Sequence, residues 1–519
     1  MSPHLPRRLL AAAALSLSLF PFQPGLAVEA RNTTAMTPAE AEEDLDLAVA
    51  ALEAGLPDIY WHQSPAEWRR AKANARERVR RTVDSEGLWR ALMPLLAQIG
   101  EGHLSLAPSD AMKQKERTTG RLLPLSVLWT QDAAYVVDGY GQAADVPRGS
   151  RILSIDGRSA ATLENDLMSA ATRDGKIRTG VLREASGNGY GELLYRMTGS
   201  RESFELKLAT SDGKINTRIV RGVLPSMRGK GPAVTTPQVA SLEWLDADTA
   251  YLNVPTFSNK RYREAGADYQ ATLQGTFDEL HSRRAKNLIL DLRQNGGGSE
   301  PNESILFSYL VHEPLRKYEA VEARSQRIAV TDAHGVRYET EVFDDDEMKS
   351  QRRLPNGRLT RLNLPPGGLM TRWSRSAPVY DGHLVVLAGG DTFSGGAELA
   401  SMLYHARRAI FVGEEVGGTH EGNTSGYRWN LTLPNSGMTL RIPLLKFRFA
   451  WRGLPHDRGV PPDCFVPPNA WEFGQPKDAA WRVAKRLLKQ AWSTGGEPTW
   501  SRPGQVSCPI QATGQDAPL

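Results

Sequence analysis

Apolar positions recur at different spacings along this chain, and the changes of spacing divide it into three regions. From residue 37 to residue 99 they follow helical spacing, which predicts helices. The segment Thr37–Glu40 reads TPAE, a capping box with proline at the first helical position, and marks a helix start. Two more helices are predicted over residues 65–83, which are strongly basic, and over residues 85–99. The basic run is interpreted as a solvated helix face.

Between about residues 122 and 220 the pattern changes to short alternating runs separated by glycine, aspartate and proline. Such runs predict the strands of a small β domain. Residues 146–157 contain a turn at glycine, an apolar strand and an Asp-Gly turn, and resemble the central signature of a PDZ domain. PDZ domains bind peptide C-termini by adding the peptide to a sheet edge as a strand. Residues 170–200 are polar and glycine-rich, and are interpreted as an insertion.

From about residue 240 onward, apolar strand segments alternate with helical ones, which predicts an α/β region. The predicted strands cover residues 249–255, 286–292, 384–388 and 409–413. The predicted helices cover residues 262–284 and 397–407. Residues 341–366 are acidic, then basic, then rich in proline and glycine, so we expect a surface excursion there.

The first 27 residues have the order of a secretory signal peptide. Arg7 and Arg8 precede an apolar run over residues 9–20, and small residues follow up to Ala27. The run is shorter than the roughly 20 apolar residues that a membrane-spanning helix needs. We therefore expect export to a bacterial periplasm or the extracellular space, with no stable membrane span after cleavage.

Composition narrows the class of protein further. The 519 residues are 40% hydrophobic and 24% charged, which indicates a soluble globular chain of two or three domains. Its 63 basic residues nearly balance 59 acidic ones and form no basic stripe, so nothing favours a nucleic-acid partner. Cys464 and Cys508 lack histidine-rich spacing around them and do not predict a zinc site. In an exported chain they form either a disulfide, the favoured interpretation, or two free thiols.

The segment Asp291–Gly298 places three consecutive glycines shortly after a predicted buried strand. Glycine allows positive φ and close approach of another backbone. Successive N–H groups in such a loop can point into one space, which suits an oxyanion. A tight turn without a ligand explains the same residues equally well.

Ser394 lies in the segment DTFSGGAELA, at the turn between a predicted strand and an apolar helix. Free N–H groups and the positive end of the helix dipole favour negative charge at such a turn, which suits an attacking alkoxide. Serine is also a common N-cap, and taken alone this residue is better explained in that way.

Together the motifs resemble the tail-specific (C-terminal-processing) serine proteases. The resemblance rests on DLRQNGGG, on the serine turn about 100 residues later, and on GEEVGG, YLNVPTF and GVPPD, and it covers most of residues 40–470. It implies that Ser394 is the nucleophile. It also implies an oxyanion hole formed by the N–H groups of Gly297 or Gly298 and of Gly395, and peptide hydrolysis that uses no metal or cofactor.

The general base departs from the best-known pattern of that family. Many members carry a lysine about 25 residues after the serine, where this chain has Thr419 and His420. A second branch, similar to the tricorn core protease, uses a histidine from the end of its N-terminal helical part. The segment EGHLS, residues 101–105, resembles the histidine segment of that branch. We therefore assign His103 as the base, since a neutral imidazole with a pKa near 6.5 can accept the serine proton. With that pKa, kcat/KM is expected to fall as the pH is lowered through about pH 7.5 to pH 6, because His103 becomes protonated. His420 is the rival base, and Lys446 lies in an apparent strand.

A catalytic histidine needs an acceptor that orients it. Asp457 is the best candidate, followed by Glu415 and Glu421. Glu398, in the helix after the serine turn, is interpreted as structural. The tricorn-like branch has a serine before its histidine, whereas this chain has Gly102.

The expected architecture is multidomain α/β, with a peptidase core of stacked β-β-α units that is ClpP/crotonase-like. The expected segments are a signal peptide (1–27), a helical N-terminal part (35–115), a PDZ-like domain (116–225), the core (235–470) and a C-terminal helix and tail (471–519). The alternative for the core is a crotonase acting on acyl-CoA thioesters, which leaves the β domain and the signal peptide unexplained.

The expected function is an exported serine endopeptidase acting on unfolded or partly degraded polypeptides. The alternative is a catalytically inactive peptide-binding protein of the same fold, which the missing lysine favours.

Overall fold

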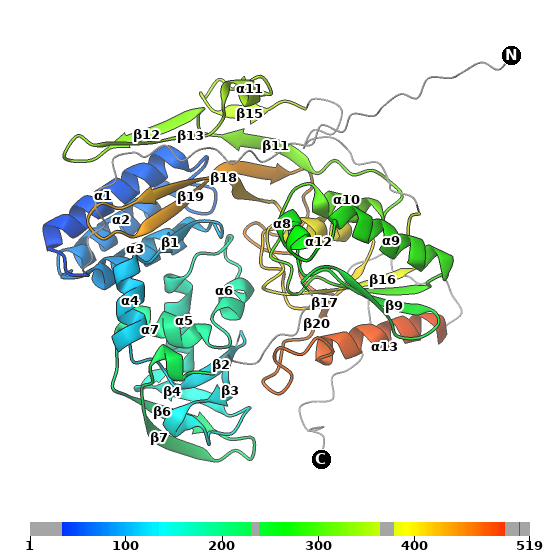
Figure 1. The fold of residues 1–519 in the computed structure, drawn as a ribbon, viewed down its shortest axis with the longest axis horizontal. Coiled ribbons are helices and arrows are strands. Elements are labelled where there is room, and N and C mark those ends of the chain that lie inside the picture. Colours follow the sequence, from blue (N-terminus) through cyan, green and yellow to red (C-terminus); the bar gives the residue numbers. More distant parts are fainter. Residues whose placement is uncertain (1–33, 132, 230–237, 364–377, 494–507, 509–519) are drawn as a thin grey trace.

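The computed structural model describes residues 34–131, 133–229, 238–363, 378–493 and 508. The predicted signal peptide lies outside these residues. Within them, no helix is both long enough and apolar enough to span a membrane. Figure 1 shows a group of N-terminal helices, a small β domain next to them, and a larger α/β core on the other side of the molecule.

The N-terminal region is helical, as predicted. Its helices are α1 (Pro38–Gly55), α2 (Pro65–Val79), α3 (Ser85–Ile99) and α4 (Asp110–Thr119). The Thr37 hydroxyl accepts a hydrogen bond from the Glu40 N–H, and the Glu40 carboxylate accepts one from the Thr37 N–H, which confirms the capping box. Helix α2 ends earlier than expected, and its buried residues are Trp68, Ala75 and Val79. Its basic side chains therefore form a solvated face.

The predicted small β domain is present and has its own hydrophobic core. Its sheet has the order β2-β3-β4-β6-β7, with β5 beside β4, and the pairs are antiparallel. The strands are β2 (Leu125–Trp129), β3 (Ala134–Gly139), β4 (Arg151–Ile155), β5 (Arg158–Ser159), β6 (Ser203–Ala209) and β7 (Ile215–Arg221). The helices are α5 (Ala160–Ala170), α6 (Thr179–Glu184), α7 (Gly189–Thr198) and the short η1 (Gly141–Ala143) and η2 (Pro225–Met227). The likeness of this domain to a PDZ domain stays a prediction.

The segment interpreted as an insertion, residues 170–200, is instead part of the core of this domain. It forms α6 and α7, and Val181, Leu182, Tyr190 and Leu194 are buried against the sheet. These few apolar side chains attach both helices to the sheet.

The α/β core contains a six-stranded sheet with the order β20-β17-β16-β10-β9-β8. The strands are β8 (Ser241–Trp244), β9 (Thr249–Asn253), β10 (Asn287–Asp291), β16 (His383–Ala388), β17 (Ile410–Gly413) and β20 (Cys464–Phe465). Strand β8 is antiparallel to β9, and the other neighbours are parallel. The four strands predicted in this region are confirmed. Asp291 pairs with Leu387, so the carboxyl ends of β10 and β16 lie side by side, and the glycine segment meets the serine turn there.

Helices cover both faces of this sheet. They are α8 (Asn259–Glu264), α9 (Tyr269–Ser282), α10 (Asn302–Ser308), α12 (Gly395–His405) and α13 (Ala479–Ser493). Leu288 and Val386 face the main core with α9 and α12, whereas Ile289 and Val385 pack on the α13 side. The single helix expected over residues 262–284 is broken into α8 and α9, and Gly266, with φ 70°, lies between them. The regular β-β-α repeat expected for the core is interrupted between β10 and β16.

A second, antiparallel sheet joins the N-terminal region to the core. Its order is β1-β19-β11-β15-β14, with β18 beside β19. The strands are β1 (Ser105–Ala107), β11 (Tyr318–Ala323), β14 (Gln351–Arg353), β15 (Leu359–Arg361), β18 (Gly422–Thr432) and β19 (Thr439–Phe449). A separate hairpin is formed by β12 (Arg327–Thr331) and β13 (Arg337–Glu341), and the short helix α11 (Asp345–Met348) follows it. Ser105 pairs with Arg441, so the chain directly after His103 is fixed to a core strand. The excursion expected at residues 341–366 contributes β14 and β15 to this sheet.

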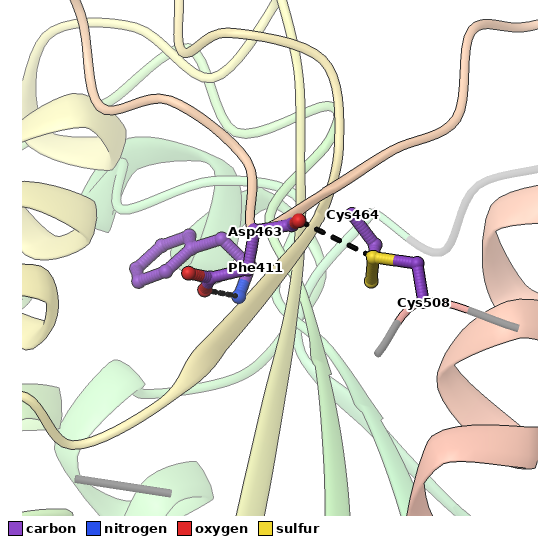
Figure 2. Close-up of a disulfide and its surroundings, with 4 residues drawn as sticks. All are labelled: Phe411, Asp463, Cys464 and Cys508. Carbon is purple, nitrogen blue, oxygen red and sulfur yellow. Dashed lines mark hydrogen bonds between the residues drawn. A yellow bond between two sulfur atoms is a disulfide. The ribbon is translucent and has the colours of Figure 1, made fainter. Parts of the chain in front are cut away.

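Cys464 in β20 and Cys508 form a disulfide, with their Cα atoms 5.6 Å apart. Figure 2 shows the Cys508 sulfur next to the Asp463 carbonyl oxygen, at 3.3 Å. The Asp463 carboxylate accepts a hydrogen bond from the Phe411 N–H of β17. The favoured pairing of the cysteines is therefore present, and it attaches the C-terminal segment to the edge of the core sheet.

Replacing both cysteines by serine is expected to lower the free energy of unfolding by about 3–4 kcal/mol. The bridge closes a loop across a sequence separation of 44 residues, and without it the unfolded chain gains conformational entropy. Denaturant unfolding of the oxidised protein and of the Cys464→Ser, Cys508→Ser double variant measures the difference. Thiol titration of denatured, unreduced protein should find no free thiol, and two free thiols would rule the bridge out.

Candidate active site

Ser394 lies at the turn between β16 and α12 in a backbone conformation that residues other than glycine rarely adopt. Its φ is 52° and its ψ is −127°. Such a conformation costs on the order of 1–3 kcal/mol, and it persists where the surrounding structure imposes it, often at functional sites. The Ser394 side chain makes no capping hydrogen bond to α12. Ser394 therefore occupies the N-cap position of α12, but its hydroxyl does not cap the helix.

The Ser394 hydroxyl lies against His103. The distance from His103 Nε2 to Ser394 Oγ is 3.1 Å, within hydrogen-bonding range for a general base. The Phe393 ring packs on the imidazole, with 4.6 Å between ring centroids. The structure thus brings the predicted nucleophile and the predicted base together, and their catalytic roles stay predictions.

The segment that carries this histidine is held on both sides. The Gly102 N–H donates a hydrogen bond of 2.6 Å to the buried Asp174 carboxylate. The buried Glu101 carboxylate accepts hydrogen bonds from the Thr424 hydroxyl, at 2.7 Å, and from the Thr424 N–H, at 3.2 Å. A Cβ at Gly102 would lie 2.8 Å from the Phe393 ring. This close packing explains why glycine stands where the tricorn-like branch has a serine.

Among the residues that the structure describes, no carboxylate orients His103. Its Nδ1 is buried and has no hydrogen-bond partner in the described part of the chain. Burial lowers the pKa of His103 to about 4, with a smaller contribution from Arg428 in the same direction and an opposing one from Glu398. The imidazole therefore stays neutral well below pH 6. The loss of activity on acidification is therefore expected at a lower pH than the range of about pH 6 to 7.5 that an unperturbed histidine predicts.

Asp457, predicted to orient His103, belongs to a different cluster. Its carboxylate accepts a hydrogen bond of 2.6 Å from His62 Nδ1 and lies 3.1 Å from Lys176 Nζ. Burial acts to raise the pKa of Asp457, but the hydrogen bonds from His62 and Lys176, with the charge of His456, together outweigh burial and lower the pKa to about 2. His62 comes from the turn between α1 and α2. No local pattern signals this contact, because the two residues are 395 positions apart.

The other two candidate acceptors are also engaged elsewhere. The Glu415 carboxylate accepts two hydrogen bonds from the Arg458 guanidinium, at 2.8 and 2.7 Å. The Glu421 carboxylate accepts one from the Asp457 N–H, at 3.2 Å.

The rival bases make their contacts away from the serine turn. The His420 ring lies 6.0 Å from the His405 ring, at the C-terminal end of α12. Helix α12 has 11 residues and spans about 16 Å, and Ser394 precedes its other end. Lys446 lies in β19, as predicted, and its ammonium contacts the Asp58 carboxylate at 2.7 Å.

A buried lysine next to the start of α12 escaped the sequence analysis. Lys317 Nζ lies 2.5 Å from Glu303 and 3.3 Å from Glu300, and it also contacts Glu398. Burial acts to lower the pKa of Lys317, but these carboxylates outweigh burial and raise it. Its amine stays protonated and cannot replace the missing lysine base. The contact with Glu398 agrees with a structural role for that residue.

The glycine segment after β10 packs directly against the serine turn. A Cβ at Gly297 would lie 2.7 Å from both the Gly395 nitrogen and the Ser394 Cβ, so the approach requires glycine. Asn295 connects the two segments. Its carbonyl oxygen accepts a hydrogen bond from the Phe393 N–H at 3.0 Å, and its side-chain oxygen accepts one from the Gly297 N–H at 2.9 Å.

Because the Gly297 N–H is engaged in this way, the predicted oxyanion hole reduces to Gly298 and Gly395. Gly298 forms a parallel bridge with Phe257 in which its two neighbours make the hydrogen bonds. The Gly298 N–H therefore points away from Phe257. The Gly395 N–H begins α12 and has no acceptor among the described residues, as expected for the first turn of a helix.

A cleft of about 560 Å³ opens beside the serine turn. Its lining residues include Gly102, Thr172, Val181, Gly296, Phe393 and Gly417. The walls come from the N-terminal segment, the β domain and the core. Two lining residues, Gly102 and Phe393, are the immediate neighbours of His103 and Ser394.

Residues 248–466, which contain the serine turn and the glycine segment, match the sequence model of peptidase family S41. This match identifies the α/β core of the chain as a serine-type peptidase region of family S41. No curated protein matches the chain.

Solved structures share the fold. A crystal structure of mature CPAF is 16% identical, covers 88% of this chain and 98% of its own, and has a TM-score of 0.60. A structure of mature CPAF complexed with lactacystin is 16% identical, covers 88% of this chain and 97% of its own, and has a TM-score of 0.59. These likenesses show a common multidomain α/β fold. A crystal structure of the tricorn protease is 13% identical, covers 87% of this chain and 37% of its own, and has a TM-score of 0.34.

Proposed function

We propose that this chain is an exported serine endopeptidase that hydrolyses unfolded or partly degraded polypeptides through an acyl-enzyme on Ser394. The observation that carries the proposal is the 3.1 Å contact between His103 Nε2 and Ser394 Oγ, at a strained turn packed against the glycine segment. The match of residues 248–466 to peptidase family S41 supports the reaction class. Export rests on the signal peptide predicted from the sequence.

The mechanism follows from this geometry. His103 Nε2 accepts the hydroxyl proton while Ser394 Oγ attacks the carbonyl carbon of the peptide bond. The N–H groups of Gly298 and Gly395 stabilise the oxyanion of the tetrahedral intermediate. His103 then gives the proton to the leaving amine, and an ester on Ser394 remains. Water, deprotonated by the same imidazole, hydrolyses the ester and restores the enzyme.

The shape of the cleft supports an unfolded substrate. At about 560 Å³ it has room for a short extended segment, and a folded domain is too large to enter. Thr172 and Val181 belong to the region of the β domain and line the same cleft. We assign this domain a PDZ-like role, in which it binds the polypeptide by strand addition and presents it to Ser394.

A serine-reactive fluorophosphonate probe is expected to label the wild-type protein and not the Ser394→Ala variant. An activated hydroxyl forms a covalent bond with such a probe, whereas ordinary serines do not. Gel fluorescence and intact mass measure the label, with one adduct expected per chain. Absence of labelling of the wild-type protein between pH 5 and pH 9 would contradict the proposal and favour a peptide-binding protein without activity.

A further inference from the structure

Four metal-ligating side chains converge at a place that the proposed reaction does not use. His62, Glu421, His456 and Asp457 offer ligand atoms that all lie within 4.8 Å of one another. They come from the turn between α1 and α2, from the residue before β18, and from the loop after β19. Three of the four side chains are largely buried, with exposed fractions of 3% for His62, 8% for Asp457 and 14% for Glu421, whereas His456 is 53% exposed.

We propose that these four side chains bind one divalent transition-metal ion, best matched by Zn²⁺, as a structural centre. Two imidazole nitrogens with two carboxylate oxygens form a ligand set that suits Zn²⁺. A tetrahedral ion with ligand distances near 2.0–2.2 Å places its ligand atoms about 3.3–3.6 Å apart. The four atoms need only small movements to reach that spacing, and the exposed His456 provides the route of entry.

The existing contacts already converge on one point. His62 Nδ1 and His456 Nδ1 both contact the same oxygen of Asp457, Oδ1, and His456 Nδ1 lies 3.6 Å from Glu421 Oε1. An ion at this point replaces the imidazole protons that these contacts require. Lys176 contacts the other oxygen of Asp457, Oδ2, and its side chain is 73% exposed, so it can stay or turn away.

The charge around the cluster also favours a cation. Besides Asp457, the buried carboxylates of Glu101 and Asp174 act electrostatically on His62. Asp457 and Glu421 therefore carry the negative charge next to the imidazole, and Glu101 and Asp174, whose pKa values burial raises, add to it when they are ionised. Two positive charges at the centre offset this excess more fully than a proton does.

The backbone of Asp457 is held in place for this role. Its φ is 66°, a left-handed conformation. The Lys176 N–H donates a hydrogen bond of 3.0 Å to the Asp457 carbonyl, and a Cβ at Gly175 would lie 2.7 Å from the Asp457 Cα. The loop therefore presents the carboxylate in one direction, which lowers the cost of ordering a ligand.

The ion would join three segments next to the proposed base. His62 packs against Gly100, since a Cβ there would lie 2.7 Å from the His62 Cβ. Gly100 precedes His103 by three residues, and the Gly175 N–H donates a hydrogen bond of 2.9 Å to the Gly100 carbonyl. The ion thus supports the segment that carries His103 and takes no part in the chemistry at Ser394.

Calorimetric titration of chelator-treated protein with Zn²⁺ tests the site. One ion per chain is expected for the wild type, with at least about a tenfold loss of affinity in His456→Ala and in Glu421→Gln. His281→Ala, which removes an exposed histidine from α9, is the matched control and should bind as the wild type does. Co²⁺ should give the visible absorption of a four-coordinate site, and the His456→Ala variant should lose it.

Two results would overturn the inference: no stoichiometric uptake by the wild type, or equal uptake by the wild type and by both ligand variants. The same titration of Ser394→Ala should give unchanged binding. That experiment separates the ion site from the proposed peptidase function, because metal uptake does not depend on turnover.

Discussion

Ser394→Ala is expected to lower kcat for peptide hydrolysis by on the order of 10⁶-fold, as loss of the nucleophile does in other serine peptidases. In the proposed mechanism the Ser394 hydroxyl forms the acyl-enzyme, and the structure places no second hydroxyl in contact with His103 among the described residues. KM should change little, because the cleft proposed to bind the substrate is lined by other residues. Steady-state kinetics on an unfolded protein substrate measures both constants.

Ser401→Ala is the matched control for this substitution. Ser401 is a buried serine in α12, and its hydroxyl makes no hydrogen bond within the described part of the chain. Its replacement should leave kcat within about threefold of the wild type. Ser394→Gly should be as inactive as Ser394→Ala but more stable by about 1 kcal/mol, because glycine adopts φ 52° without strain. Turnover retained in Ser394→Ala, or lost in Ser401→Ala, would mean that another residue is the nucleophile.

Local patterns in the sequence predict most of the fold. The capping box at Thr37 fixes the start of α1, and the apolar runs at residues 249–255, 286–292 and 384–388 become β9, β10 and β16. Neighbouring residues determine these elements, so one sequence contains the information. The interpretation of residues 170–200 as an insertion failed because average polarity hid the few apolar residues that attach α6 and α7 to the β domain.

Sequence motifs predict the part of the candidate site that lies within them. The parts that depend on contacts between distant segments are missed. Ser394 and the glycine segment follow strands in the same parallel sheet, and parallel strands present their carboxyl ends at one edge. The pairing of Asp457 with His62, by contrast, depends on where the turn after α1 meets a loop near the end of the core. No local pattern predicts the buried Lys317 either, because its three carboxylate partners are distributed over two segments.

His103→Ala is expected to lower kcat by about 10³-fold or more with the fold intact, by analogy with the loss of a catalytic triad member in other serine peptidases. Among the described residues, His103 Nε2 is the only nitrogen base in contact with Ser394 Oγ that could accept the hydroxyl proton. His420→Ala is the control and should have little effect, since its ring lies near the far end of α12. Near-normal turnover in His103→Ala, together with loss in His420→Ala or Lys446→Ala, would overturn the assignment.

The pH profile gives a second and independent reading of the same residue. Falling pH protonates an imidazole and removes its ability to accept a proton, so kcat/KM falls as pH drops through the pKa of the base. Burial lowers the pKa of His103 to about 4, so this acid limb should lie near pH 4 to 5. Arg428→Gln removes a positive charge that acts in the same direction as burial, and should therefore move the limb to higher pH by a fraction of a unit. An acid limb that stays between pH 6 and pH 7.5 and does not move in Arg428→Gln would mean that the imidazole is more exposed to water in the working enzyme than its burial in the structure implies.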